Sequence, residues 1–248
     1  MTRLHRRQDT DCFHHVMARG CRGQPIFEHT ADRLHFTNLL AQAVEEFGWT
    51  VFDWTLMPNH HHLLLRLEEQ NLAAGMHQIH FKFAQLWNER HESTGHVFFR
   101  RYKNVHFIAD EAARRVMKYI DLNPVRASLC ELPDDWAWGG YAANVGEHRA
   151  LPFHAHERGL TLMIPAASSA EEARVEYRRA VLDRLRVYRG RGSIDDVRPT
   201  LSEIVRPDEI DSVREANEVW RYSRRAIAAH IGCSPQTITN RLRRSKWT

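Results

Sequence analysis

The order of strand-like and helix-like segments between residues 13 and 108 constrains the fold of this chain more than any other feature. Residues 13–18 are apolar and β-prone, and the glycine-containing stretch after them predicts a strand followed by a turn. Apolar residues with helical spacing then run from Thr30, the predicted N-cap, to Gly48, the predicted stop. The chain is therefore expected to begin with a strand and a helix.

The next segments are expected to form a hairpin, a second helix and a further strand. Two β-rich runs, residues 49–57 and 62–67, are separated by the breaker Pro58-Asn59, which predicts two antiparallel strands. A second helix is expected at residues 72–91, and residues 97–108 indicate an extended strand. This order is typical of the split βαβ arrangement, an α+β ferredoxin-like or RRM-like antiparallel sheet with helices on one face.

The second half of the chain is expected to be helical. A third helix begins at Asp110 and is interrupted at Asn123-Pro124, since the residue before a proline disfavours helical geometry. Beyond it, proline and small polar residues precede a charged amphipathic stretch. We therefore expect a first domain at residues 1–150, a linker at 151–170 and a C-terminal all-α region at 171–248.

The charge is mildly basic overall and strongly basic at the C-terminal end. The formal net charge is +4 and the pI about 9.0, which is compatible with a polyanionic partner without indicating one. Residues 221–248 contain no Asp or Glu. Their basic residues are Arg221, Arg224, Arg225, Arg241, Arg243, Arg244 and Lys246.

Composition excludes several classes of protein. With 43% hydrophobic and 27% charged residues, the chain is not disordered throughout. The four cysteines form no CxxC pair, which argues against a zinc knuckle or a disulfide framework. No apolar run approaches the length of about 18 residues typical of a membrane span. We expect a cytoplasmic protein that makes no membrane contact.

Three adjacent histidines stand at the start of the second hairpin strand. Strand alternation puts His60 and His62 on one face of the sheet and His61 on the other. Two imidazoles on one face can bind a single divalent ion and leave positions for a phosphate oxygen and a third protein ligand. The alternative interpretation is a solvent-exposed or hydrogen-bonded histidine cluster.

The third helix carries a second candidate pair. Tyr119 and Asn123 are four residues apart and share a helix face. An amide oxygen suits a hard divalent ion, and a tyrosine hydroxyl can act as a nucleophile. The alternative interpretation is that Tyr119 packs in the core, as a single tyrosine on a helix more often does, and that Asn123 marks a helix C-terminus.

Taken together, these segments resemble the HUH-type single-tyrosine transposases of the IS200-like superfamily, in particular the REP-associated branch. The resemblance spans about residues 13–130, and one departure is His61, since relatives usually have an aliphatic residue there. The matching stretches are residues 15–16, 19–20, 23–27, 57–62 (MPNHHH), 95–103 (GHVFFRRYK) and 119–127 (YIDLNPVRA).

The resemblance implies a reaction and a substrate. It makes residues 1–150 the catalytic domain, Tyr119 the nucleophile, and His60, His62 and Asn123 the ligands of Mg²⁺ or Mn²⁺. Attack on single-stranded DNA would leave a 5′-phosphotyrosine and a free 3′-OH, so that strand transfer becomes feasible. The implied substrate is a REP-like DNA hairpin, and the implied assembly is a monomer or a homodimer.

Two further segments suggest contacts to nucleic acid. Arg100, Arg101 and Lys103 alternate with aromatic residues, a composition suited to phosphates and unpaired bases, although a strand with solvated basic residues would look the same. Basic residues elsewhere that could extend this surface are Arg19, Arg22 and Arg126.

Residues 223–244 resemble a helix-turn-helix, with Ser234 as N-cap and Pro235 at the first position of the second helix. A basic helical hairpin that only packs on the first domain is the alternative. The side chains expected to face duplex DNA are Gln236, Thr237, Asn240 and Arg243.

Two other functions stay open at this point. A DNA-binding regulator could keep the fold without transposition, and a metal-dependent hydrolase could use the histidines while Tyr119 plays no part.

Overall fold

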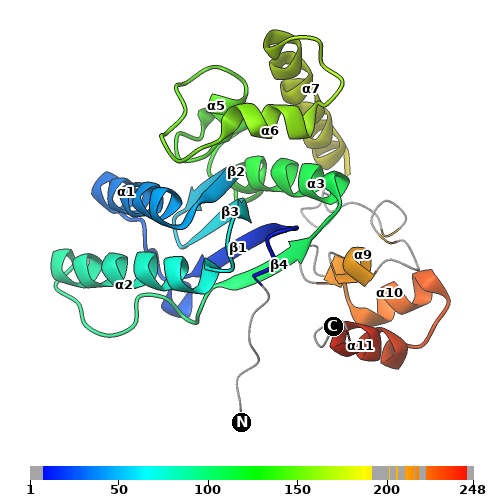
Figure 1. The fold of residues 1–248 in the computed structure, drawn as a ribbon, viewed down its shortest axis with the longest axis horizontal. Helices are drawn as coiled ribbons and strands as arrows, with labels where there is room; N and C mark the ends of the chain where they lie inside the picture. The colour runs from blue at the N-terminus through cyan, green and yellow to red at the C-terminus, as the bar shows by residue number, and fades with distance from the viewer. Residues whose placement is uncertain are drawn as a thin grey trace.

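A four-stranded antiparallel sheet forms the centre of the molecule. The computed structural model describes residues 8–191, 201, 205, 210–214, 216–217 and 222–244. The strands lie in the order β2-β3-β1-β4, which confirms the predicted ferredoxin-like arrangement (Figure 1). Their bounds are β1 Phe13–Arg19, β2 Trp49–Met57, β3 His60–Leu67 and β4 Lys103–Phe107.

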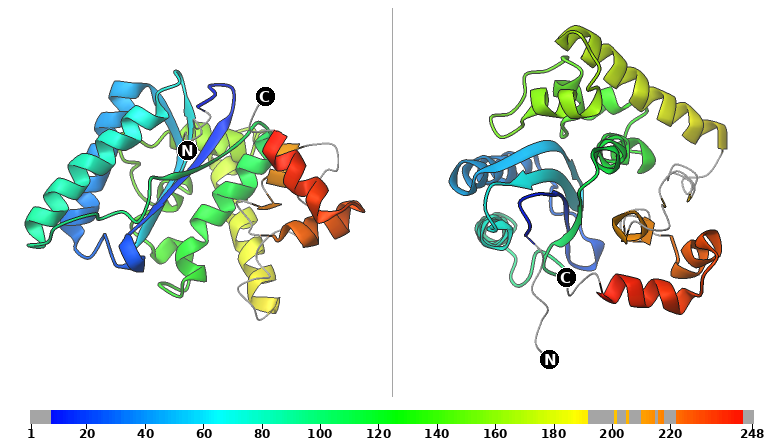
Figure 2. Two further views of the ribbon diagram at one scale, coloured as in Figure 1. Left: turned by 90° about the horizontal axis from the view of Figure 1, so that it is seen from below. Right: turned by 45° about the vertical axis from the view of Figure 1, so that its right-hand side comes forward.

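Helices cover both faces of this sheet. α1 (Thr30–Phe47) and α2 (Leu72–Arg90) lie together on one face, as predicted, and α3 (Asp110–Asp121) lies on the other (Figure 2). Alternate residues of β3 divide accordingly. Leu63 and Leu65 pack in the core beneath α1 and α2, and Leu64 packs beneath α3. β3 is therefore buried on both sides and reads as a nearly continuous apolar run.

The capping of α1 differs from the expectation. Thr30 is the first helical residue, and the backbone N–H of His29 donates to the carboxylate of Asp32 at 2.9 Å. The stop at Gly48 is confirmed, because this residue adopts a left-handed conformation with φ 66° that a side chain would oppose.

The predicted strand at residues 97–108 is wrong in its first half. Regular pairing to β1 begins at the Met17–Lys103 pair, and one isolated bridge joins Gly20 to Phe98. Residues 99–102 thus lie opposite only residues 18–19 of β1, and because this segment is two residues longer, it loops out of the sheet. The loop carries Phe99, Arg100 and Arg101.

The outer edge of β2 is closed by segments from later in the chain. The N–H of Leu56 donates to the carbonyl of Trp138 at 2.8 Å, and Gly140 N–H donates to Trp54 at 2.9 Å. Further along, Ala155 N–H donates to the carbonyl of Val51 at 2.9 Å. These bonds satisfy backbone groups that an edge strand would otherwise expose.

Residues 151–170, expected to be a linker, contain helix α6 (His156–Met163) and the buried side chains of Phe153, Leu160 and Met163. The division of the chain into domains stays a prediction. The remaining elements are η1 Cys21–Gly23, α4 Asn123–Arg126, η2 Pro133–Asp135, α5 Tyr141–Asn144, α6 His156–Met163, α7 Ala170–Arg191, α9 Ile210–Arg214, α10 Arg224–Ile231 and α11 Pro235–Arg244. Within the described part of the chain, no helix combines the length and apolar character needed to cross a bilayer.

The C-terminal helices α10 and α11 are joined by a tight turn. Gly232 ends α10 with φ 78°, and the Ser234 hydroxyl accepts the N–H of Thr237 at 3.1 Å, so Ser234 caps α11 as predicted. Ile227 of α10 and Ile238 of α11 are both fully buried. The pair is therefore a packed helical hairpin.

Two buried acidic side chains meet between β2, α3 and α7. The Tyr177 hydroxyl donates to Asp121 at 2.9 Å, and one oxygen of Asp121 and one of Asp53 have no other hydrogen-bond partner. Burial raises the pKa of Asp121 to about 8 and raises that of Asp53 well above its usual value. A proton held between the two carboxyl groups gives both oxygens a partner.

Because the pKa values of these two carboxyl groups are raised in the folded state, we expect the stability of the protein to depend on pH. From about pH 4 to about pH 8 the folded state holds protons that the unfolded state has lost. The free energy of unfolding should fall as pH rises through this window, by about 1.4 kcal/mol per pH unit for each proton. Asp121→Asn should reduce this slope in urea titrations at a series of pH values. The exposed Asp11→Asn serves as the control, and an unchanged slope in Asp121→Asn would contradict the assignment.

Candidate active site

The histidine triplet is divided between the two faces of the sheet. β3 pairs with β1 in a register that sets His62 opposite Met17 and His60 opposite Arg19. The rings of His60 and His62 lie on the α3 side with their centroids 5.0 Å apart. His61 lies on the opposite side, where its Nε2 is 3.3 Å from Nε2 of His80. The geometry follows strand alternation.

Each of the two paired histidines is held through Nδ1. Nδ1 of His60 lies 2.6 Å from Oδ1 of Asn59, and Nδ1 of His62 lies 2.9 Å from Nε2 of His15. If each Nδ1–H donates, both Nε2 atoms keep a lone pair for a metal ion. No role was expected for His15 from local sequence patterns. His15 lies on β1, and its position beside His62 can be inferred only when the pairing of β1 with β3 is known.

The protonation states of these imidazoles fit metal binding. Burial, with a smaller contribution from the charge on Arg19, lowers the pKa of His60 to about 4. Burial also lowers the pKa of His62 well below its usual value and that of His15 to about 3. All three rings are therefore neutral near pH 7, and a neutral imidazole is the form that coordinates a divalent ion.

Tyr119 faces the same site from α3. Its ring centroid lies 5.5 Å from that of His62 and 6.0 Å from that of His15, both in edge-on geometry. The guanidinium of Arg126 lies 4.8 Å from the centre of the Tyr119 ring. The tyrosine is half-buried, so its side chain packs against its neighbours and is also accessible from the site.

Asn123 lies next to this group without facing the same space. α3 ends at Asp121, Leu122 caps it, and Asn123 begins the short helix α4. Its amide donates to the backbone carbonyl of Tyr119 at 3.5 Å, and it does not line the cavity described next. Its role as a metal ligand stays a prediction.

A cavity of about 600 Å³ opens over the histidines and the tyrosine. The loop that departs from the sheet at residues 99–102 forms one of its walls. Basic groups on this wall can contact phosphates, and the ring of Phe99, 59% exposed, can stack on a base. The residues predicted to bind DNA that line it are Arg19, Arg100, Arg101 and Lys103.

The other residues predicted to bind DNA lie outside this cavity. Arg22 is exposed in η1. On α11, Gln236 and Asn240 are exposed and bonded to each other at 3.1 Å, whereas Thr237 is half-buried. Arg243 belongs to α11, but its side chain lies outside the described residues.

Comparison with known proteins supports the relationship that these features suggest. Residues 9–123 match the sequence model of a family described as "Transposase IS200 like". A solved structure, "Structure of the REP associates tyrosine transposase bound to a REP hairpin", superposes with a TM-score of 0.50 at 13% identity. The match covers 62% of this chain and 92% of that one, which shows a common fold. No curated protein matches the chain.

Metal binding at His60 and His62 should depend on His15. Replacing His15 with Phe removes the group that orients His62, and loss of such a partner typically lowers metal affinity about 10- to 100-fold. Gln at this position offers an acceptor and should restore part of the affinity. Calorimetric titration with Mn²⁺ measures both variants. Equal affinities for wild type and His15→Phe would show that His15 does not support the site.

Proposed function

Because residues 9–123 belong to the IS200-like transposase family, we propose that this chain nicks and rejoins single-stranded DNA in a metal-dependent reaction at Tyr119. The observation that carries the proposal is the position of the Tyr119 ring, 5.5 Å from the ring of His62, beside a cavity with basic walls. The nearness of a hydroxyl nucleophile to two neutral imidazoles suits phosphodiester chemistry.

In the proposed reaction, the hydroxyl oxygen of Tyr119 bonds to the scissile phosphorus. The bond to the 3′ oxygen breaks, the tyrosine proton is released, and the departing oxygen is protonated to a 3′-OH. The product is a 5′-phosphotyrosine, and a second 3′-OH can reverse the step because the phosphodiester linkage is conserved. His60 and His62 would hold Mg²⁺ or Mn²⁺, which would supply charge stabilisation at the phosphate oxygen when bound.

The chain's own residues organise the DNA. Arg100, Arg101 and Lys103 hold the backbone in the cavity, and Phe99 stacks on an unpaired base. Arg126, stacked on the Tyr119 ring, keeps a positive charge beside the nucleophile. Tyr119 lies beside His62 of its own chain. A single subunit therefore holds both the proposed nucleophile and the proposed metal ligands.

We propose a hairpin substrate of the REP type, supported by the fold shared with a transposase whose structure was solved with a REP hairpin. The exposed residues of α11 would add a second contact, to duplex DNA. Monomeric or dimeric assembly, a cytoplasmic location and the ligand role of Asn123 stay predictions.

Substitution of the nucleophile tests the reaction. Wild-type protein with Mn²⁺ and a labelled hairpin oligonucleotide should form a covalent adduct that survives a denaturing gel. Tyr119→Phe should form none, because it lacks the attacking oxygen, while His60→Ala should slow adduct formation by at least about 100-fold.

The alternatives give different results in the same assay. Cleavage that persists in Tyr119→Phe would indicate a metal-dependent hydrolase. Binding without cleavage by the wild-type protein would indicate a regulator, the function that the helical hairpin α10–α11 could serve alone.

The basic residues in the cavity wall should make the binding of single-stranded DNA depend on salt concentration. Arg101→Ala should weaken binding to single-stranded DNA and reduce the slope of log K against log salt concentration by about 0.7, the value for one phosphate contact. Fluorescence anisotropy across a salt series measures this slope. Arg149→Ala, an exposed arginine outside the cavity, should leave it unchanged. Equal slopes in all three proteins would exclude a phosphate contact at Arg101.

A further inference from the structure

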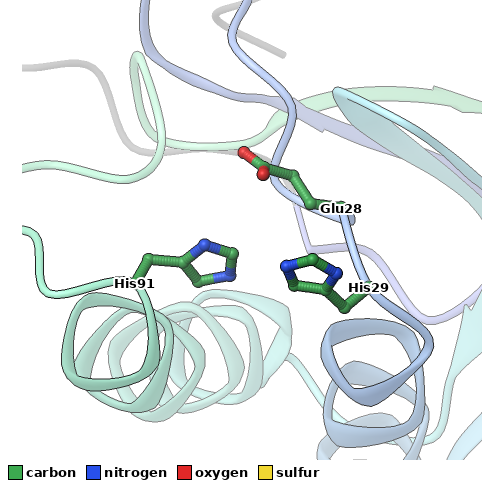
Figure 3. A group of neighbouring side chains, drawn as sticks. All are labelled: Glu28, His29 and His91. Carbon is green, nitrogen blue, oxygen red and sulfur yellow. The ribbon is translucent and has the colours of Figure 1, made fainter.

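A second group of metal-ligating side chains lies where α1 begins and α2 ends. Glu28 and His29 directly precede α1, and His91 directly follows α2. One ligand atom from each residue lies within 4.8 Å of the other two. Figure 3 shows the Glu28 carboxylate above the gap between the two imidazoles. The three donors converge from segments more than sixty residues apart in the chain.

The two rings are held in position by their surroundings. His29 and His91 are nearly parallel, with centroids 5.5 Å apart and an angle of 14°. The ring of His91 also stacks on that of Trp87, with centroids 4.2 Å apart. His91 therefore has little freedom to turn away, and a ligand whose orientation is fixed in advance loses less entropy on binding.

A buried carboxylate supports this group from behind. Oδ1 of Asp32, which is fully buried, lies 3.2 Å from Nε2 of His91 and 2.7 Å from the guanidinium of Arg90. When Nε2–H donates to Asp32, Nδ1 of His91 keeps the lone pair that a metal requires. Metal-bound histidines commonly have such a carboxylate partner on the second ring nitrogen.

The donor set selects the kind of ion. Two imidazoles and one carboxylate match Zn²⁺ and its neighbours in the transition series better than Mg²⁺ or Ca²⁺, which prefer oxygen ligands. Glu28 and His29 are exposed, so an ion can enter from solvent and complete its coordination with water. Three protein ligands and one water form a common tetrahedral set for Zn²⁺.

We propose that Glu28, His29 and His91 bind a Zn²⁺-class transition-metal ion that ties the start of α1 to the end of α2. The site is separate from the one predicted at His60 and His62, because α1 and α2 lie on the opposite face of the sheet from α3. It does not depend on the proposed reaction. The bound ion should add a link between two helices that already meet through side-chain packing and through the Arg90–Asp32 ion pair.

Zinc titration of the full chain tests the proposal. In a His60→Ala/His62→Ala background, which removes the predicted active-site ligands, calorimetry should detect one equivalent of Zn²⁺ bound. Adding His29→Ala should lower that affinity at least about tenfold, since loss of a direct ligand costs no less than loss of its supporting partner. The exposed loop residue His148→Ala is the matched control and should have no effect.

Two further measurements separate binding from folding defects. Zn²⁺ should raise the melting temperature of the His60→Ala/His62→Ala protein and raise it less after Glu28→Gln, which replaces an exposed group. Co²⁺ bound in place of Zn²⁺ should show the intense visible bands of tetrahedral geometry. No binding at micromolar Zn²⁺ in that background, or equal binding after His29→Ala, would overturn the proposal.

Discussion

The burial of β3 on both faces is the constraint on which the rest of the structure depends. Leu63 and Leu65 fill the core beneath α1 and α2, while Leu64 fills the core beneath α3. A slip of one residue in the pairing of this strand would exchange its two faces. The same register that satisfies the leucines therefore keeps His60 and His62 toward Tyr119.

Burial also sets the chemistry of the site. In a region shielded from water the charged imidazolium is disfavoured, so the histidines lose their protons without help from a strong base. Asn59 and His15 then decide which nitrogen faces the cavity. The fold supplies the protonation state, and two neighbouring side chains supply the orientation.

Local patterns predicted much of the fold, whereas contacts between distant segments escaped them. The hairpin of β2 and β3, α1 and the cap at Ser234 depend on neighbouring residues, and the structure confirms them. The loop at residues 99–102 follows from unequal lengths of two segments that meet only in the folded chain. The support of His62 by His15 also requires a register that local spacing cannot reveal. The resemblance, not the pattern, gave Tyr119 its expected role.

The closure of the β2 edge has a consequence for how the molecule can be divided. The matched family segment ends at residue 123, but Trp138, Gly140 and Ala155 cover the free edge of β2. A fragment cut at residue 123 would present a bare row of amide and carbonyl groups to solvent. Such an edge recruits strands from other molecules, so the fragment would tend to aggregate. The segment after the third helix thus prevents strands of other molecules from pairing with the edge of β2.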